Sequence, residues 1–112
     1  MNAPRLNRRL VLEARDRAQD GSGGYVGSWQ TLGTLWAEVT SRSGREAVRV
    51  GAPVSATEFK IVVRATPVGA PSRPLPEQRF RDGDRLFLIR AVAERDSDGR
   101  YLTCFASEER AV

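Results

Sequence analysis

The 112-residue sequence contains no histidine and a single cysteine, Cys104. The lack of histidine excludes a Ser–His–Asp triad, a histidine general base and a histidine-ligated metal. One cysteine can form neither an internal disulfide nor a cysteine-rich zinc site. Because no histidine is present to activate its thiol, we expect Cys104 to be a small buried residue and not a nucleophile. The composition argues against an enzyme and predicts neither a cofactor nor a metal.

Long apolar runs are also absent from the sequence. No segment approaches the roughly 20 apolar residues that span a bilayer, so no membrane partner is expected. The apolar stretch at residues 10–12, which follows several basic residues, is too short for a signal peptide. The length and the 40% share of hydrophobic residues predict a single globular domain over residues 1–112.

The net charge of +4 comes almost entirely from arginine, since Lys60 is the only lysine. A basic balance favours nucleic-acid binding, because cationic side chains release counterions from phosphates. A GC-rich gene, however, produces the same arginine excess whatever the function. The arginines are spread along the chain and alternate with acids, as in residues 13–17 and 81–85. This pattern is typical of a solvated surface with many salt bridges.

Short segments of alternating apolar and polar residues, separated by turn signals, run along the chain. They predict strands over residues 9–15, 25–32, 34–40, 57–64, 85–92 and 100–106. We expect Gly33 to break the second strand from the third. Residues 85–92 are apolar on both faces, which predicts a central strand that is covered on both sides. Six short strands and no long helix predict an all-β fold, a small β-barrel or sandwich with long loops.

The connecting segments differ in what they predict. Asp and Gly at residues 81–84 and 96–99 favour hairpin turns over a calcium loop, which would need a downstream glutamate. The glycine-rich residues 19–24 predict a hairpin loop, because a phosphate-binding loop needs a following Lys-Ser/Thr and a helix. The loops at 41–57 and 65–78 are long for so small a domain, and such loops are usually functional or disordered.

Four aromatic residues of the predicted strands have two interpretations. Tyr25, Trp29, Trp36 and Tyr101 could stack single-stranded bases on a sheet face, as in oligonucleotide-binding barrels. Packing in the core and between neighbouring strands is the favoured interpretation.

Seven segments, in this order, carry a resemblance to a known family. They are LNRRLVLE (6–13), GSWQTL (27–32), TLWAEV (34–39), SGRE (43–46), TEFKIVVR (57–64), DGDRLFLIRAV (82–92) and LTC (102–104). The most specific part is the WAEV motif followed by SGRE. The series resembles the phage head–tail joining proteins of tailed bacteriophages and gene-transfer particles, also called head-completion, head-closure or stopper proteins. The proline-rich segment 65–78 is longer than the family pattern.

The resemblance implies a mechanical role and no enzymatic one. Members of the family form a ring, commonly of six or twelve copies, below the portal or its adaptor. The ring closes the DNA-filled head and docks the tail. The implied partners are further copies of the chain, the portal or adaptor ring above, and the tail terminator or tail tube below. DNA would be present only as the content of the channel, and the location would be a virion or phage-like particle assembled in the bacterial cytoplasm.

The resemblance also implies which loops make the contacts. The loop after residue 40 would face the channel and help to hold DNA back, through Ser41, Arg42, Ser43, Gly44, Arg45, Glu46 and Arg49. The proline-rich loop is expected to contact neighbouring subunits or neck proteins through Pro67, Pro71, Arg73, Pro74 and Pro76. No catalytic, cofactor-binding or metal-binding residue is implied.

Two other functions stay open at this point. The charge and the aromatic residues are compatible with a small nucleic-acid-binding β-barrel, which would bind DNA or RNA with a steep salt dependence. The other is a related tail-completion protein, placed lower in the neck, which composition does not separate from a head-completion protein.

Overall fold

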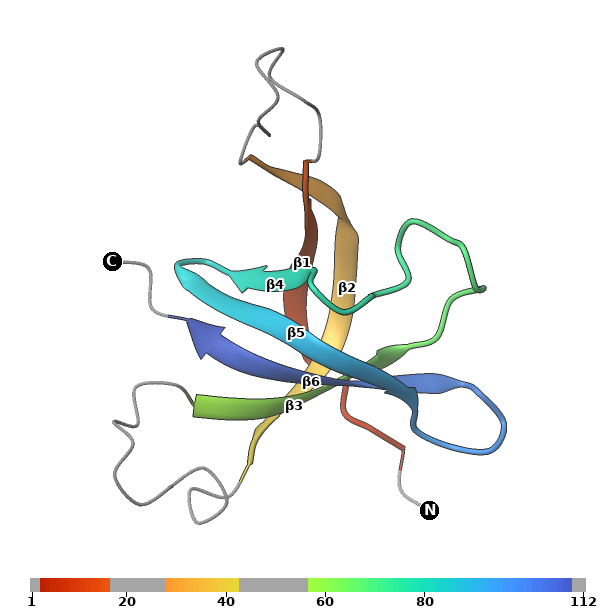
Figure 1. Cartoon of the computed structure of the whole chain (residues 1–112). Helices are drawn as coiled ribbons and strands as arrows, with labels where there is room; N and C mark the ends of the chain where they lie inside the picture. The colour runs from red at the N-terminus through yellow and green to blue at the C-terminus, as the bar shows by residue number, and fades with distance from the viewer. Residues whose placement is uncertain (1–2, 17–27, 43–56, 110–112) are drawn as a thin grey trace.

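The computed structural model describes residues 3–16, 28–42 and 57–109. Its six strands are β1 (Arg8–Arg15), β2 (Trp29–Ser41), β3 (Thr57–Arg64), β4 (Arg79–Asp82), β5 (Arg85–Glu94) and β6 (Tyr101–Glu109). They close into an antiparallel barrel in the order β1–β2–β3–β6–β5–β4 (Figure 1), which confirms the predicted all-β barrel. Within these three segments there is no helix, and hence none that is long and apolar enough to cross a membrane.

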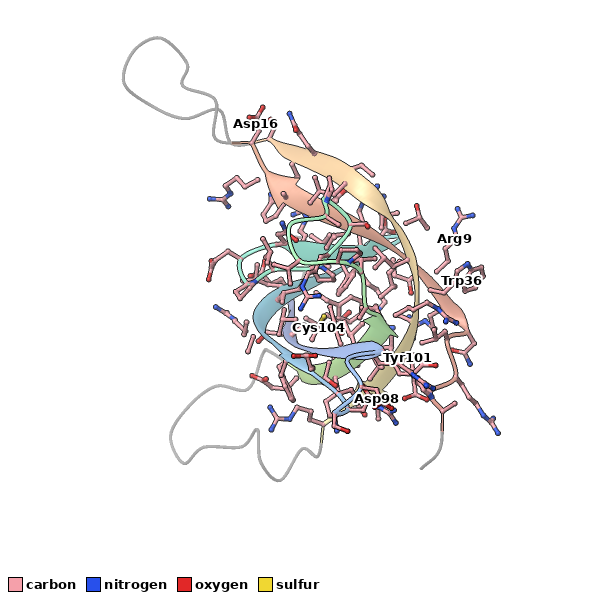
Figure 2. The ribbon with its side chains drawn as sticks, turned by 90° about the vertical axis from the view of Figure 1, so that its right-hand side faces the viewer. Arg9, Asp16, Trp36, Asp98, Tyr101 and Cys104 are labelled. Carbon is pink, nitrogen blue, oxygen red and sulfur yellow. The ribbon has the colours of Figure 1, made fainter. Side chains whose placement is uncertain are left out.

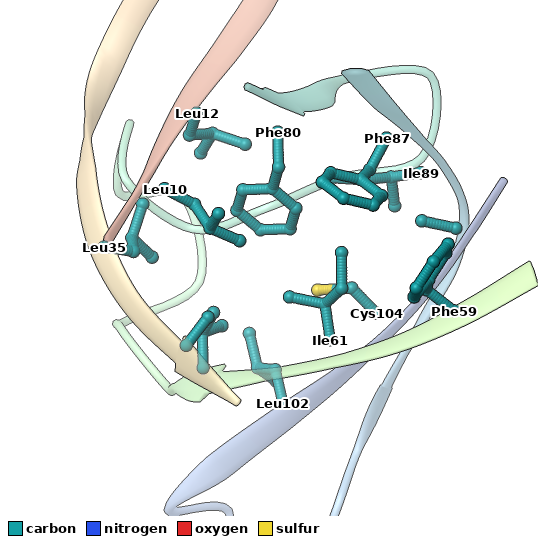
Figure 3. Packing of buried hydrophobic residues seen from close by; sticks show 13 residues of the cluster. Leu10, Leu12, Leu35, Phe59, Ile61, Phe80, Phe87, Ile89, Leu102 and Cys104 are labelled. Atoms are coloured by element: carbon teal, nitrogen blue, oxygen red, sulfur yellow. The ribbon is translucent and has the colours of Figure 1, made fainter. Parts of the chain in front are cut away.

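The barrel interior is an apolar core to which every strand contributes. Successive side chains of a strand point to opposite faces, so every second residue enters the barrel. The rings of Phe59 and Phe87 meet edge to face, with centroids 5.1 Å apart and an interplanar angle of 80° (Figure 3). The alternation expected for residues 34–40, 57–64 and 100–106 is present, and one apolar face of each segment lies in the core. The core residues are Leu10, Leu12, Leu35, Ala37, Phe59, Ile61, Val63, Phe80, Phe87, Ile89, Leu102, Cys104 and Ala106.

Strand β2 is continuous through Gly33, so the predicted break at that glycine is wrong. Gly33 lies opposite Leu12 in the β1–β2 ladder, and the next pair is Glu13 with Thr31. Leu32 is therefore an extra residue on β2, which forms a bulge there. A bulge bends a strand and increases its twist without ending it. The two strands predicted at 25–32 and 34–40 are one strand from Trp29 onwards, and residues 25–27 lie outside the described residues.

Strand β4 was not predicted, and it closes the barrel. Residues 81–84 were expected to form a turn, but Arg81 and Asp82 belong to β4 and only Gly83 and Asp84 form the turn. Gly83 has a φ of 62° at the first turn position, which is typical of a type II′ hairpin. The seam between β1 and β4 contains three residue pairs. A strand of four residues with one buried side chain, Phe80, is too short to give a clear alternating pattern.

The double coverage predicted for residues 85–92 is also wrong. Phe87 and Ile89 point into the barrel and are fully buried. Leu86 and Leu88 on the outer face are partly buried, and Ala91 is exposed. A closed barrel of this size has one interior, so a strand in its wall is packed on one side only.

Candidate functional site

The predicted channel loop begins at the barrel end where β2 and β6 finish. The ladders pair Ser41 with Phe59 and Thr57 with Glu108, which brings these strand ends together near the β4–β5 turn (Figure 1). Ser41 and Arg42 are both exposed. The other predicted channel residues, Ser43, Gly44, Arg45, Glu46 and Arg49, lie outside the described residues.

Arg42 is anchored to β3 where the predicted channel loop begins. Its backbone N–H donates to the carbonyl oxygen of Glu58 at 2.8 Å. Its guanidinium lies 3.8 Å from a carboxylate oxygen of Glu58 and 5.5 Å from the centre of the Phe105 ring. The hydroxyl of Ser107 on β6 also donates to Glu58, at 3.5 Å. The first residue of the loop is thereby fixed to the two strands beside it.

Arg85 covers the core at this same end of the barrel. Its Nε and one Nη atom donate to the two carboxylate oxygens of Glu108 at 2.8 and 3.1 Å. Its guanidinium carbon lies 5.5 Å and 4.9 Å from the ring centres of Phe59 and Phe87. The hydrogen bonds to Glu108 raise the pKa of Arg85, so its charge is secure. No pattern in the sequence indicates this pair, because 23 positions separate the two residues.

The proline-rich segment 65–78 is folded against the barrel by hydrogen bonds at both of its ends. The N–H of Ala65 donates to the carbonyl oxygen of Arg100 at 2.8 Å. At the other end, Glu77 and Gln78 exchange backbone hydrogen bonds of 3.0 and 2.9 Å with Ile89 on β5. The segment is therefore held in place and is not a free extended loop.

The five predicted contact residues of this segment divide into two groups. Pro74 is fully buried, and the guanidinium of Arg73 donates to the carbonyl oxygen of Thr66 at 2.6 Å. These two residues therefore make their contacts within the chain. The remaining three, Pro67, Pro71 and Pro76, are exposed and available to a neighbour.

A network of charges lies on the outside of β1 and β4, next to the barrel seam. Glu13 is only 5% exposed and receives hydrogen bonds from Arg79 at 2.7 Å and Arg81 at 2.8 Å. Burial raises the pKa of Glu13, but the hydrogen bonds and charges of Arg81 and Arg79 outweigh it and leave the pKa below its ordinary value. At the other end of the seam Arg8 forms an ion pair with Asp82. The short β1–β4 seam thus has ion pairs at both of its ends.

Trp29 packs against this network and is not free to stack bases. The guanidinium carbons of Arg79 and Arg15 lie 4.0 Å and 5.2 Å from the centre of its ring. For Trp29, the packing interpretation is confirmed. Tyr25 lies outside the described residues.

Trp36 and Tyr101 lie in a row of alternating cationic and aromatic side chains. Trp36 pairs with Arg9 on β1, and Tyr101 pairs with Arg64 on β3. Arg64 also shares a shallow hollow with Trp36. The guanidinium carbons of Arg64 and Arg95 lie 6.0 Å and 5.8 Å from the Tyr101 ring centre.

We call Arg9, Trp36, Arg64, Tyr101 and Arg95 the cation–aromatic row. Figure 2 shows Arg9 and Trp36 beside each other at the outer surface. Trp36 is 56% exposed, which is unusual for so large an apolar side chain. The outward alternation of each strand was predicted, but the row depends on strand pairing, which single-strand patterns do not fix.

The remaining sequence candidates are structural. Cys104 is fully buried in the core, as predicted, and burial raises the pKa of its thiol to about 12. The carboxylate of Asp96 accepts a hydrogen bond from the N–H of Arg100 at 3.0 Å, which confirms the turn at residues 96–99. Among the residues placed by the structure, no three side chains are grouped as a metal site requires. The glycine-rich segment 19–24 lies outside the described residues.

Comparison with known proteins identifies the family. The sequence pattern of the family described as Phage head completion protein matches residues 1–109. A chain of the solved virion of a native gene transfer agent particle is 56% identical, with a TM-score of 0.79; the match covers 97% of this chain and 100% of that chain. A Shigella flexneri 2a protein solved in solution, 23% identical over 96% of each chain with a TM-score of 0.69, shares the fold. No curated protein matches. Because the family pattern covers nearly the whole sequence, the chain belongs to the phage head completion protein family.

Proposed function

We propose that this chain is a structural neck protein that completes the head of a phage or phage-like particle. In this proposal, a ring of six or twelve copies lies under the portal or adaptor, closes the DNA-filled head and docks the tail. The observation that carries the proposal is the 56% identity, over nearly the full length of both chains, to a chain of a gene transfer agent virion. The role is mechanical, and the particle is assembled in the bacterial cytoplasm.

The barrel end at Arg42 is suited to carry a loop into the channel of such a ring. Arg42 is held by Glu58, and Arg85 covers the core next to it. A loop that leaves a fixed anchor can project without disturbing the barrel. We assign the channel role to Ser41, Arg42, Ser43, Gly44, Arg45, Glu46 and Arg49. The arginines of this loop would face the phosphates of the packaged DNA, to which cationic side chains are attracted.

The exposed prolines of segment 65–78 are suited to contact other neck proteins. Pro67, Pro71 and Pro76 have fixed φ angles and lie on a segment that is bonded to the barrel at both ends. Such a surface loses little conformational entropy when it binds a partner.

Electron microscopy of particles from a strain that lacks this protein tests the proposal. We expect tailless heads that have lost their DNA beside free tails, and joined particles when purified protein is added back. A variant in which Arg42, Arg45 and Arg49 are replaced by glutamine should join tails but retain less DNA. Normal joined particles in the deletion strain would contradict the proposal.

Nucleic-acid binding is the second candidate function, and the cation–aromatic row is the observation that favours it. Arginine and aromatic side chains that alternate on a sheet face can contact phosphates and stack on bases. In that case the protein should retain DNA on a column at low salt and release it steeply as the salt concentration rises. No retention at low salt would reject this function.

A further inference from the structure

The cation–aromatic row has a potential complement on the other side of the barrel. The row is centred on β2 and β3, and the closed strand order places β5 three strands from β2 in either direction. A groove of about 390 Å³ lies beside β5, where residues 75–78 and Leu88 face the end of β1 and Trp29 at the start of β2. We call it the acidic groove and define it by Leu75, Pro76, Glu77, Leu88 and Glu109. In Figure 2, β5 lies on the side of the barrel away from Trp36.

The charges on these two surfaces are opposite, and two residues of each surface form no ion pair within the described chain. Arg9 and Arg64 form no ion pair with any described residue, and neither Glu77 nor Glu109 has a cationic partner there. The groove also contains one guanidinium, that of Arg15, which lies over Trp29. Glu77 and Glu109 are therefore exposed in the groove, and Arg9 and Arg64 are exposed in the row, which also contains Arg95.

Both surfaces also expose large apolar side chains. Three large hydrophobic residues are exposed in the described segments: Trp36 (56%), Leu75 (53%) and Val68 (86%). Trp36 is in the row and Leu75 is in the groove. Tryptophan and arginine are enriched where protein interfaces have their strongest contacts. An exposed tryptophan between two arginines thus fits a groove that is both apolar and acidic.

Glu77 has a backbone conformation that glycine would adopt more easily. Its φ is 76°, and among the described residues it is the only one other than glycine with a positive φ. A side chain in this region costs about 1 kcal/mol relative to glycine. The exposed Glu77 carboxylate makes no contact within the described chain that offsets this cost. Residues held in such conformations are concentrated at functional sites.

We propose that the cation–aromatic row of one copy packs into the acidic groove of the next copy, with Trp36 against Leu75 and the arginines facing Glu77 and Glu109. The inference rests on the proposed ring and names its subunit contact. A ring needs two different complementary surfaces on each subunit, and surfaces on opposite sides of a barrel let every copy contact two neighbours.

DNA is the less suitable occupant of the row. The proposed channel loop begins at the end of β2 and leads to the start of β3, whereas Arg64 is the last residue of β3. A strand of eight residues is about 26 Å long. If the loop faces the channel, the row lies away from the DNA. Binding of DNA to the row would also not explain why the same protein has an acidic and apolar groove that complements the row.

Charge reversal in the particle tests the contact. In the deletion strain, Arg64→Glu or Glu77→Arg alone should reduce the number of joined particles about tenfold, and the double variant should restore them to within about twofold of the natural chain. Arg90→Glu is the matched control, because Arg90 is exposed on β5 outside both surfaces. Glu77→Gly separates contact from folding: we expect joining to fall while the free energy of unfolding stays the same or rises.

Cysteine cross-linking gives a second readout. A chain with Trp36→Cys and Leu75→Cys should form a ladder of covalent oligomers in oxidised particles, while each single variant should form none. Cys104 does not interfere, because it is buried in the core.

The outcomes of the two tests separate the contact from the proposed function. If joining requires the protein but no ladder forms and the double charge reversal does not restore joining, the contact is wrong and the proposed function stands. If the deletion strain joins normally, the proposed function itself fails. If Trp36→Ala abolishes DNA retention and leaves the number of joined particles unchanged, the row binds DNA and the inference is overturned.

Discussion

Arg85 holds both carboxylate oxygens of Glu108 while its guanidinium covers the rings of Phe59 and Phe87. We expect Arg85→Ala to lower the free energy of unfolding by about 1–2 kcal/mol, because it removes two charge-assisted hydrogen bonds and uncovers the core. Urea unfolding measures the change. Arg100→Ala is the control, since Arg100 and Asp98 are 4.0 Å apart and strongly exposed, and it should cost less than about 0.5 kcal/mol. Equal losses would show that Arg85 does not stabilise the barrel end.

Glu13 is expected to make the barrel sensitive to acid. Its pKa is lowered in the folded chain, so the unfolded chain takes up a proton first as the pH falls. Its contribution to stability is therefore present above the ordinary glutamate range and is lost as the pH falls through the folded pKa. We expect Glu13→Gln to cost about 2 kcal/mol at pH 7 and much less at about pH 3.

Urea unfolding at these two pH values measures the effect of Glu13. Asp98→Asn, which removes an exposed carboxylate, should change little at either pH. A loss for Glu13→Gln that is the same at both values would contradict the assigned ion-pair role.

Gly33 and Gly83 are expected to respond in opposite ways to alanine. A Cβ atom at Gly33 would meet the Cβ of Ser72 at 3.8 Å, an ordinary contact, and glycine within a strand costs about 0.5–1 kcal/mol relative to alanine. Gly33→Ala should therefore leave the free energy of unfolding unchanged or raise it. Gly83→Ala should lower it by about 1 kcal/mol, because Gly83 has a φ of 62° in the β4–β5 turn. Thermal or urea unfolding of the two variants measures the change. If Gly33→Ala lowered the free energy of unfolding as much as Gly83→Ala, the continuous β2 would be refuted.

Cys104 is expected to be unreactive in the native protein. Its pKa is raised to about 12, so almost no thiolate is present at pH 8. A thiol reagent should label it only after addition of urea, and rapid labelling of the native chain would contradict its place in the core. The raised pKa also determines how the stability of the fold depends on pH. Stability should fall as the pH rises above about 8.5, where the unfolded thiol loses its proton and the folded thiol does not.

The sequence predicted those parts of the fold that depend on local alternation. Each inward set, such as Phe59, Ile61 and Val63, follows from a period of two residues in a strand. The turn at residues 96–99 follows from Asp and Gly side chains and their backbone preferences. The failures at Gly33 and at β4 have one cause: a bulge in a long strand and a strand of four residues are both decided by pairing with β1.

The candidate site was less predictable, because its contacts join residues that are distant in the sequence. Arg85 and Glu108, or Arg64 and Tyr101, meet only when the barrel closes and the strand register is set. Segment 65–78 was expected to be a long loop, and its prolines did not indicate that Pro74 would be buried. The expectation for the channel loop came from family resemblance, and the structure adds the anchor of Arg42 on Glu58.

Closure by the β1–β4 seam has a consequence for how the particle can be built. Every described strand of the barrel has a hydrogen-bonded neighbour on both sides, so none of the six is an edge strand along its whole length. A second copy therefore meets no complete strand edge to extend, and closure of the barrel opposes growth of open-ended fibrils through backbone pairing. Contacts with other molecules would then rest mainly on side chains, and surface residues can be exchanged to suit a new partner while the closed barrel stays the same.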